Sequence, residues 1–144
     1  MSITLDYRET HLAQCFDALG QTYKTENLLV GDIHIESETP QFKVIIERKT
    51  FNDLSSSIID NRFREQRARL DTIKSENKDS NLRIMYIIEG SKNTRGVSQN
   101  VITGALLGLV LRNGFGLFYS NSTKHTAEVC CSILKKILKG DLIQ

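Results

Sequence analysis

The stretch GDIHIESETPQFKVIIERKTFNDL, residues 31–54, runs through two strand-like segments to the start of a helix. β-branched and apolar residues at 32–36 and 42–47 predict two strands, and Pro40 among polar neighbours predicts the turn between them. The two segments therefore predict an antiparallel hairpin. Charged residues stand at its open end, where apolar packing alone gives no reason for them, and so they point to a chemical site.

The remaining chain places strand and helix patterns on both sides of this hairpin. Further strands are predicted at residues 2–6, 23–29, 82–88 and 115–119. Helices are predicted at residues 10–19, from a cap at Thr50 or Asn52 through residue 59, and at 62–74, 97–112 and 122–139. The order β-α-β-β-β-α-α-β-α-β-α predicts an α/β sandwich in which helices flank a central mixed sheet.

Length and composition are those of an ordinary globular domain. The chain has 144 residues, 40% hydrophobic and 25% charged, with a formal net charge of +2. This length suits one domain, residues 1–144, and the small net charge does not by itself indicate nucleic-acid binding. Three cysteines show neither metal-ligand spacing nor an even disulfide count, and the longest apolar run, residues 101–111, is too short to span a bilayer. We therefore expect an intracellular protein of a reducing compartment, the nucleus or the cytoplasm.

Two carboxylates and a lysine are predicted to meet at the open end of the hairpin. Asp32 begins one strand, while Glu47 and Lys49 end its partner and share a face because they are two residues apart. Carboxylate oxygens hold Mg²⁺ together with substrate phosphate oxygens, and an adjacent lysine stabilises charge that develops on a phosphate. The pattern indicates a phosphodiester-cleaving site. The alternative is a solvated strand end with a Glu–Lys pair, which contributes little to stability.

The charged residues of the hairpin follow the order G-D-x(n)-E-R-K-x-x-x-D, formed by GD at residues 31–32, ERK at 47–49 and Asp53. This order resembles the nuclease motif of the XPF family of structure-specific endonucleases. Three other stretches are similar to that family's opening strand, basic helix and next core strand: LDYRE at 5–9, NRFREQ at 61–66 and YIIEG at 86–90. The resemblance covers nearly the whole chain, and it implies a restriction-endonuclease-like three-layer sandwich.

The resemblance implies a role for each matching position. Asp32 and Glu47 would be metal ligands, with the main-chain carbonyl of Arg48, and Lys49 would lie beside the attacking water. Asp6 would approach the metal from the neighbouring strand. The other matching residues would orient carboxylates, contact phosphate or edge the site from the basic helix: Arg8, Arg48, Asp53, Arg62 and Gln66.

The basic helix presents one face that suits the DNA backbone. Arg62, Gln66 and Arg69 stand at i, i+4 and i+7, so one face of the helix is able to lie along phosphates. The alternative is a solvated face whose charge is balanced by Glu65 and Asp71. Because the acidic motif lies immediately upstream, we favour the phosphate contact and predict DNA-binding roles for Arg62, Gln66 and Arg69, together with Arg8.

The activity that the resemblance implies is hydrolysis of a DNA strand by water, with Mg²⁺ as cofactor and Mn²⁺ as its substitute. The expected substrates are branched, flap-bearing or junction DNA. The chain would be a stand-alone form, because larger relatives add a tandem helix-hairpin-helix module and some a helicase region. Two alternatives are a catalytically silent subunit and a sequence-specific, restriction-like nuclease. Asp32, Glu47 and Lys49 are all present, which favours an active enzyme over a silent subunit.

The two helices predicted last carry more apolar residues than one sheet face covers. In residues 97–112 the predicted sheet-facing stripe leaves Leu107 and Leu111 outside it, and in residues 122–139 Val129 and Ile133 turn to another side. We expect these two helices to form a homodimer interface, as XPF-type nuclease domains are similarly paired. The alternative is full burial within one monomer. The predicted stripe of the first helix comprises Val101, Ile102, Ala105, Leu106, Leu109 and Val110.

Overall fold

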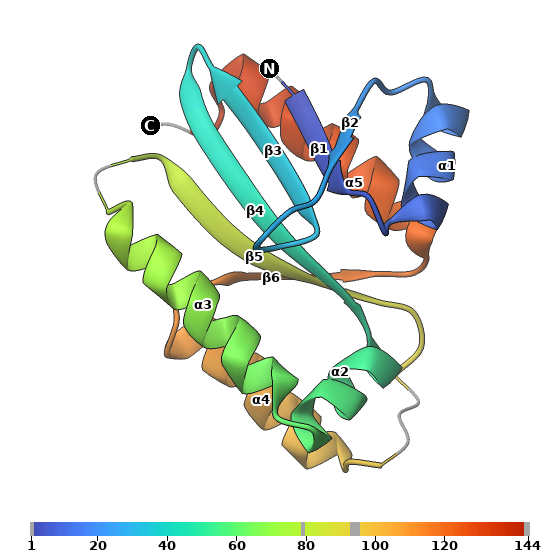
Figure 1. The fold of residues 1–144 in the computed structure, drawn as a ribbon, viewed down its shortest axis with the longest axis vertical. Coiled ribbons are helices and arrows are strands. Elements are labelled where there is room, and N and C mark those ends of the chain that lie inside the picture. Colours follow the sequence, from blue (N-terminus) through green and yellow to red (C-terminus); the bar gives the residue numbers. More distant parts are fainter. Residues whose placement is uncertain (1, 79, 93–95, 143–144) are drawn as a thin grey trace.

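A six-stranded mixed sheet forms the centre of the molecule in a computed structural model that describes residues 2–78, 80–92 and 96–142 (Figure 1). The strands are β1 (Ser2–Asp6), β2 (Lys24–Glu26), β3 (Ile33–Glu38), β4 (Gln41–Thr50), β5 (Leu82–Glu89) and β6 (Gly116–Ser120). Their order in the sheet is β2-β1-β3-β4-β5-β6. The pairs β1–β3 and β3–β4 are antiparallel, and β1–β2, β4–β5 and β5–β6 are parallel.

Helices cover both faces of this sheet. They are α1 (Thr10–Leu19), α2 (Phe51–Ile59), α3 (Arg62–Glu76), α4 (Gln99–Leu111) and α5 (Thr123–Lys139). α1 and α5 lie on one face, and α2, α3 and α4 lie on the other (Figure 1). Each face buries its own apolar cluster, so the chain forms three layers. The predicted α/β three-layer sandwich with a mixed sheet is confirmed.

Alternate residues of the β3–β4 hairpin face the two helical layers. Ile33 pairs with Ile46 and Ile35 with Val44, and all four side chains are buried in the cluster beneath α1 and α5. The residues between them therefore point toward α2, α3 and α4. β4 continues beyond Ile46 to Thr50, past the first residue of β3, and over this last stretch it pairs with β5. The motif residues 47–49 lie on this extension.

Two details differ from the sequence prediction. The strand predicted at residues 23–29 is limited to Lys24–Glu26, because the Leu28 N–H donates to Asp6 Oδ1 and the chain leaves the sheet there. On α4, Val101 and Val110 are 45% and 39% exposed and do not belong to the sheet-facing stripe. α4 packs on the edge strand β6, which covers only a narrow face of the helix. Among the described residues, no helix is long and apolar enough to cross a membrane.

Candidate active site

Asp32, which directly precedes β3, is held at the open end of the hairpin by hydrogen bonds to β4. Its N–H donates to the Ile46 carbonyl at 2.8 Å, and its Oδ2 accepts from the Arg48 N–H at 2.8 Å. Because β3 begins at Ile33, the Arg48 N–H meets no backbone partner on that strand, and the Asp32 carboxylate takes the place of a strand carbonyl. The hydrogen bond fixes the direction in which the carboxylate faces.

Gly31 explains why the motif places a glycine before this aspartate. Its φ is +71°, a conformation that side chains disfavour, and a Cβ there would stand 2.6 Å from Ile45 Cγ2. A larger residue would collide with the strand beneath the loop. Gly31 therefore allows the chain to pass close to β4 and deliver Asp32 to its end.

Glu47 and Lys49 lie on the same face of the sheet as Asp32. Each is only 7% exposed, and Lys49 Nζ stands 3.8 Å from Glu47 Oε1. Burial, and then the nearby charge of Asp32, raise the pKa of Glu47 to about 8. Burial also raises the pKa of Asp32, although the Arg48 N–H and Lys49 oppose the shift. The two carboxyl groups disfavour each other's charge, and a bound cation would relieve this.

A small pocket of about 230 Å³ opens onto these carboxylates. α3 contributes Gln66 and Arg69 to its wall, and Arg8 with the loop at residues 28–31 closes the other side. Gln66 Oε1 is buried and has no hydrogen-bond partner in the described part of the chain. An acceptor in that position is suited to a water or a ligand donor inside the pocket.

The donors around this pocket fit a hard divalent cation. Asp32 and Glu47 supply carboxylate oxygens, which Mg²⁺ prefers. Burial raises the pKa of both groups, so a cation bound between them would favour their charged forms. Within residues 2–78, 80–92 and 96–142, no group of three or more His, Cys, Asp or Glu side chains is placed to hold a metal ion. The acidic side-chain donors are therefore Asp32 and Glu47, without a third residue of these types.

Asp6 lies close by but is engaged elsewhere. Its Oδ2 accepts from Arg8 Nε at 2.7 Å, and its Oδ1 accepts from the Leu28 N–H at 3.0 Å. The hydrogen bond from Arg8 is the main cause that lowers the pKa of Asp6. In the structure Asp6 thus fixes the Arg8 side chain and the loop at Leu28, and its role as a metal ligand stays a prediction.

The other predicted residues divide between the pocket and its surroundings. Gln66, Arg69 and Arg8 line the pocket, but Arg62 does not. Arg62 is exposed, and its Nε donates to Asp60 Oδ2 at 2.8 Å. Asp53 is exposed in the first turn of α2, where its N–H donates to Thr50 Oγ1, and it does not line the pocket either. A direct contact of Arg62 or Asp53 with the substrate stays a prediction.

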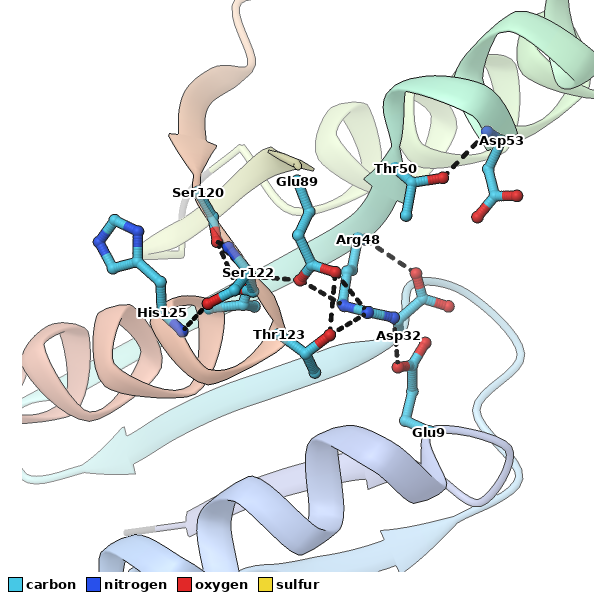
Figure 2. A network of polar contacts seen from close by, with 11 residues as sticks. Glu9, Asp32, Arg48, Thr50, Asp53, Glu89, Ser120, Ser122, Thr123 and His125 are labelled. Atoms are coloured by element: carbon cyan, nitrogen blue, oxygen red, sulfur yellow. Dashed lines mark hydrogen bonds and ion pairs between the residues drawn. The ribbon is translucent and has the colours of Figure 1, made fainter. Parts of the chain in front are cut away.

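The Arg48 side chain points toward Glu9, Glu89 and Thr123 (Figure 2). Because Arg48 directly follows Glu47 in β4, the two side chains lie on opposite faces of the sheet. Arg48 Nε and Nη2 donate to the two carboxylate oxygens of Glu89 at 2.9 and 2.6 Å, and its Nη1 donates to Glu9 Oε2 at 3.0 Å. Nη2 also lies 3.0 Å from Thr123 Oγ1, at the start of α5. The Arg48 side chain therefore joins β4 to β5, to α5 and to the residue that precedes α1.

The two acidic partners of Arg48 differ in their protonation. Burial raises the pKa of Glu9 to about 7, and the charge of Arg48 only partly opposes it. Burial would also raise the pKa of Glu89, but hydrogen bonds from Arg48, Thr126 and Thr123 outweigh it and lower the pKa. Neither residue is among those that the sequence assigns to the site, although LDYRE and YIIEG contain them. Glu9 and Glu89 are connected to the candidate site through their hydrogen bonds with Arg48.

A mixed α/β sandwich with two carboxylates and a lysine at the end of a central hairpin is the arrangement of a restriction-endonuclease-like domain. Within that class, the chain belongs to the ERCC4 domain family, whose model matches residues 5–133. The resemblance to XPF-type nucleases that the sequence motifs indicate is thereby confirmed.

Several relatives are similar over most of this chain. The 3′-flap repair endonuclease Xpf of Saccharolobus solfataricus is 31% identical over 126 residues, which are 85% of this chain and 49% of the relative. A Methanocaldococcus jannaschii protein that carries the name of an ATP-dependent RNA helicase is 28% identical over 136 residues, 94% of this chain and 16% of the relative. The chain thus spans half or less of these curated relatives.

The fold is also that of a solved XPF structure. XPF from Aeropyrum pernix in complex with DNA superposes with a TM-score of 0.76 at 26% identity, covering 96% of this chain and 65% of the XPF chain. A second structure of XPF from Aeropyrum pernix gives a TM-score of 0.75 at 25% identity, with the same coverage of both chains.

Proposed function

We propose that this chain is a divalent-metal-dependent endonuclease that hydrolyses phosphodiester bonds in branched or flap-bearing DNA inside the cell. The observation that carries the proposal is the grouping of Asp32 with the buried Glu47 and Lys49 at the open end of the hairpin. Membership of the ERCC4 domain family supports it, as do a curated relative named as a 3′-flap repair endonuclease and a structural neighbour solved with DNA. Repair and recombination, including junction resolution, are the processes that such an activity would serve.

The carboxylates of Asp32 and Glu47, with the Arg48 main-chain carbonyl, would hold the metal. Mg²⁺ is the expected ion and Mn²⁺ its substitute, and when bound it would polarise the phosphodiester and lower the pKa of the attacking water. Glu47 must release its proton to become a ligand, because its pKa of about 8 leaves it largely protonated at neutral pH in the absence of a cation. Lys49 and the nearby arginine Arg69 both favour the deprotonated form.

Lys49 would stabilise the reacting phosphate. The residue is 7% exposed and its Nζ lies 3.8 Å from Glu47 Oε1, so the side chain is withdrawn from bulk water next to a residue that lines the pocket. A fixed positive charge in such a site stabilises negative charge that develops during hydrolysis more strongly than it would in water. Gln66 Oε1, which is buried without a partner in the described chain, would accept a hydrogen bond from water.

Different arginines would serve DNA binding and the framework of the site. Arg8 and Arg69 line the pocket and would contact phosphates on either side of the cleaved bond. Arg48 is occupied on the far face of the sheet by Glu89, Glu9 and Thr123, so its side chain would hold β4 in place. Its backbone N–H orients Asp32 directly.

The exposed apolar residues at the β6 edge support a homodimer. α4 and α5, within the predicted interface helices 97–112 and 122–139, lie on opposite faces of the sheet beside this edge strand. Pairing of two copies across the edge would cover these residues and stabilise the dimer through their apolar area. The large side chains left exposed there include Leu107, Val110, Leu111, Phe118, Tyr119 and Leu138.

The deciding experiment is cleavage of end-labelled DNA with Mg²⁺ at near-physiological salt. Substrates are a Holliday junction, a 3′-flap, a 5′-flap, a splayed arm and a plain duplex, and Glu47→Gln is the matched variant. We expect the wild type to cut branched DNA near the branch point and Glu47→Gln to bind without cutting. If both proteins bind and neither cuts with Mg²⁺ or Mn²⁺, the chain is a catalytically silent binding subunit and the proposal fails.

A further inference from the structure

Two large, mainly apolar side chains are exposed to solvent beside the candidate active-site pocket. Leu29 is 86% exposed and Tyr7 is 57% exposed. Leu29 lines the pocket itself, and Tyr7 immediately precedes Arg8, which also lines it. Single exposed apolar residues are common on protein surfaces. These two are distinguished by their position and by the way in which their backbone is held.

The backbone under both residues is fixed by hydrogen bonds. The Tyr7 N–H donates to the Glu26 carbonyl at 2.9 Å, and the Leu28 N–H donates to Asp6 Oδ1 at 3.0 Å. His34 Nε2 donates to the Val30 carbonyl at 2.8 Å, so the residues on both sides of Leu29 are anchored. Leu28 is buried at 8% exposure, whereas its neighbour points outward. The loop therefore presents the Leu29 side chain from a defined position.

Cationic groups border this apolar pair. The Arg8 guanidinium carbon lies 5.5 Å from the centroid of the Tyr7 ring, and the Arg8 side chain is 67% exposed. Arg69 stands on the α3 side of the same pocket. A ligand that matches this surface has an apolar face and negative charge next to it. A nucleotide whose base is unstacked has both, whereas a fully paired duplex presents mainly phosphates.

We propose that Tyr7 and Leu29 form a contact site for an unpaired nucleotide next to the phosphate that is cut. The Tyr7 ring stacks on the exposed base, Leu29 packs against the flanking sugar or base edge, and Arg8 and Arg69 bind the adjoining phosphates. This inference rests on the proposed nuclease function and adds to it a reason why branched DNA is preferred. The selectivity comes from an apolar contact that paired DNA does not offer.

The test measures DNA binding without cleavage, in a Glu47→Gln background. The probe is a 3′-flap DNA that carries 2-aminopurine at the first unpaired nucleotide, and the reference is a plain duplex of the same length. We expect Tyr7→Ala and Leu29→Ser each to weaken flap binding about 10-fold, because stacking of one base contributes about that much. The 2-aminopurine fluorescence change should be lost with Tyr7→Ala, and duplex binding should stay unchanged.

Leu19→Ser is the matched control, since Leu19 is 42% exposed at the end of α1 and does not line the pocket. It should leave flap and duplex binding at the parent values. The inference is overturned if Tyr7→Ala and Leu29→Ser leave flap binding unchanged, or if they weaken flap and duplex binding equally. The proposed function is judged separately, by whether the protein with Glu47 intact cuts flap DNA. If the protein cuts flap DNA but Tyr7→Ala and Leu29→Ser do not affect flap binding, this inference fails and the proposed function stands.

Discussion

Arg48 and Glu89 are joined by two hydrogen bonds, of 2.9 Å from Nε to Oε1 and 2.6 Å from Nη2 to Oε2, on the face of the sheet opposite the pocket lined by Asp32 and Glu47. The same Arg48 residue donates its backbone N–H to Asp32. One residue thus connects Asp32, a proposed metal ligand, to an ion pair on the far face of the sheet. We therefore expect the activity proposed for the pocket to depend on contacts made on the other side of the sheet.

Glu89→Gln tests this dependence. The change leaves the Arg48 charge without its bidentate partner, and loss of one member of a buried pair costs about 3 kcal/mol of the free energy of unfolding. Cleavage should fall roughly 10- to 100-fold, as expected for residues that orient ligands from behind. Urea unfolding and single-turnover cleavage measure the two effects, with the exposed Glu38→Gln as control. Wild-type cleavage by Glu89→Gln would show that the ion pair does not support the site.

Glu47 should make stability depend on pH in the absence of divalent cations. Its pKa of about 8 in the folded protein lies above its ordinary value of 4.5, so between these values the folded state holds a proton that the unfolded state has released. The stabilisation is fully present below about pH 4.5 and is lost as the pH rises through about 8. Glu47→Gln removes this dependence. Its melting temperature in EDTA should exceed that of the wild type by more at pH 9 than at pH 5, and a constant difference would contradict the assignment.

Mg²⁺ should stabilise the wild type and not Glu47→Gln. A cation that binds only the folded state raises the melting temperature by mass action, and it must displace the Glu47 proton to bind. The increase should therefore be larger at pH 8.5 than at pH 6. Differential scanning fluorimetry over a series of Mg²⁺ concentrations measures it. An equal increase in both proteins would place the ion elsewhere.

Gly31→Ala should destabilise the protein and reduce cleavage. The φ of +71° and the 2.6 Å approach of a Cβ to Ile45 both oppose any side chain, with a combined cost of roughly 1–3 kcal/mol. Gly104→Ala is the control, since Gly104 lies within α4 with open space around its Cβ position, and alanine favours a helix. Urea unfolding of both variants distinguishes the local strain from a general effect of removing glycine.

Leu111→Asp should convert the proposed homodimer to a monomer. Leu111 is 79% exposed at the end of α4, and a charge in a covered apolar face disfavours pairing without disturbing the core. Analytical ultracentrifugation measures the mass, with Leu19→Asp on α1 as the control. A wild type that sediments as a monomer at all concentrations would refute the dimer.

The sequence predicts most of the architecture because its signals there are local. The hairpin can be read from β-branched runs around Pro40, and the two-residue period of strands places Glu47 and Lys49 on one face. The sequence does not reveal the partners of Arg48. Glu9 and Glu89 lie 39 and 41 residues away along the chain, and only the packing of α1 and β5 beside β4 brings them together.

Only part of the helix face predicted for DNA binding lines the pocket, for a similar reason. Gln66 and Arg69 reach the pocket, but Asn61 adopts a φ of +69° before α3, and Arg62 turns to pair with Asp60 in this short break. Helical spacing assumes a continuous helix around each residue, and Arg62 is the first residue after the break. Val101 and Val110 are exposed, contrary to the prediction, because the edge strand β6 covers only a narrow face of α4.

Thr123 connects the Arg48 network to helix α5. Its hydroxyl contacts both Arg48 and Glu89, and it is the first residue of α5, one of the two helices proposed to meet a second copy of the chain. A shift of that helix end would pull on Arg48, and the Arg48 N–H would carry the strain to Asp32. Dimer formation and cation binding would then be coupled across the sheet, so that each would change the affinity of the other.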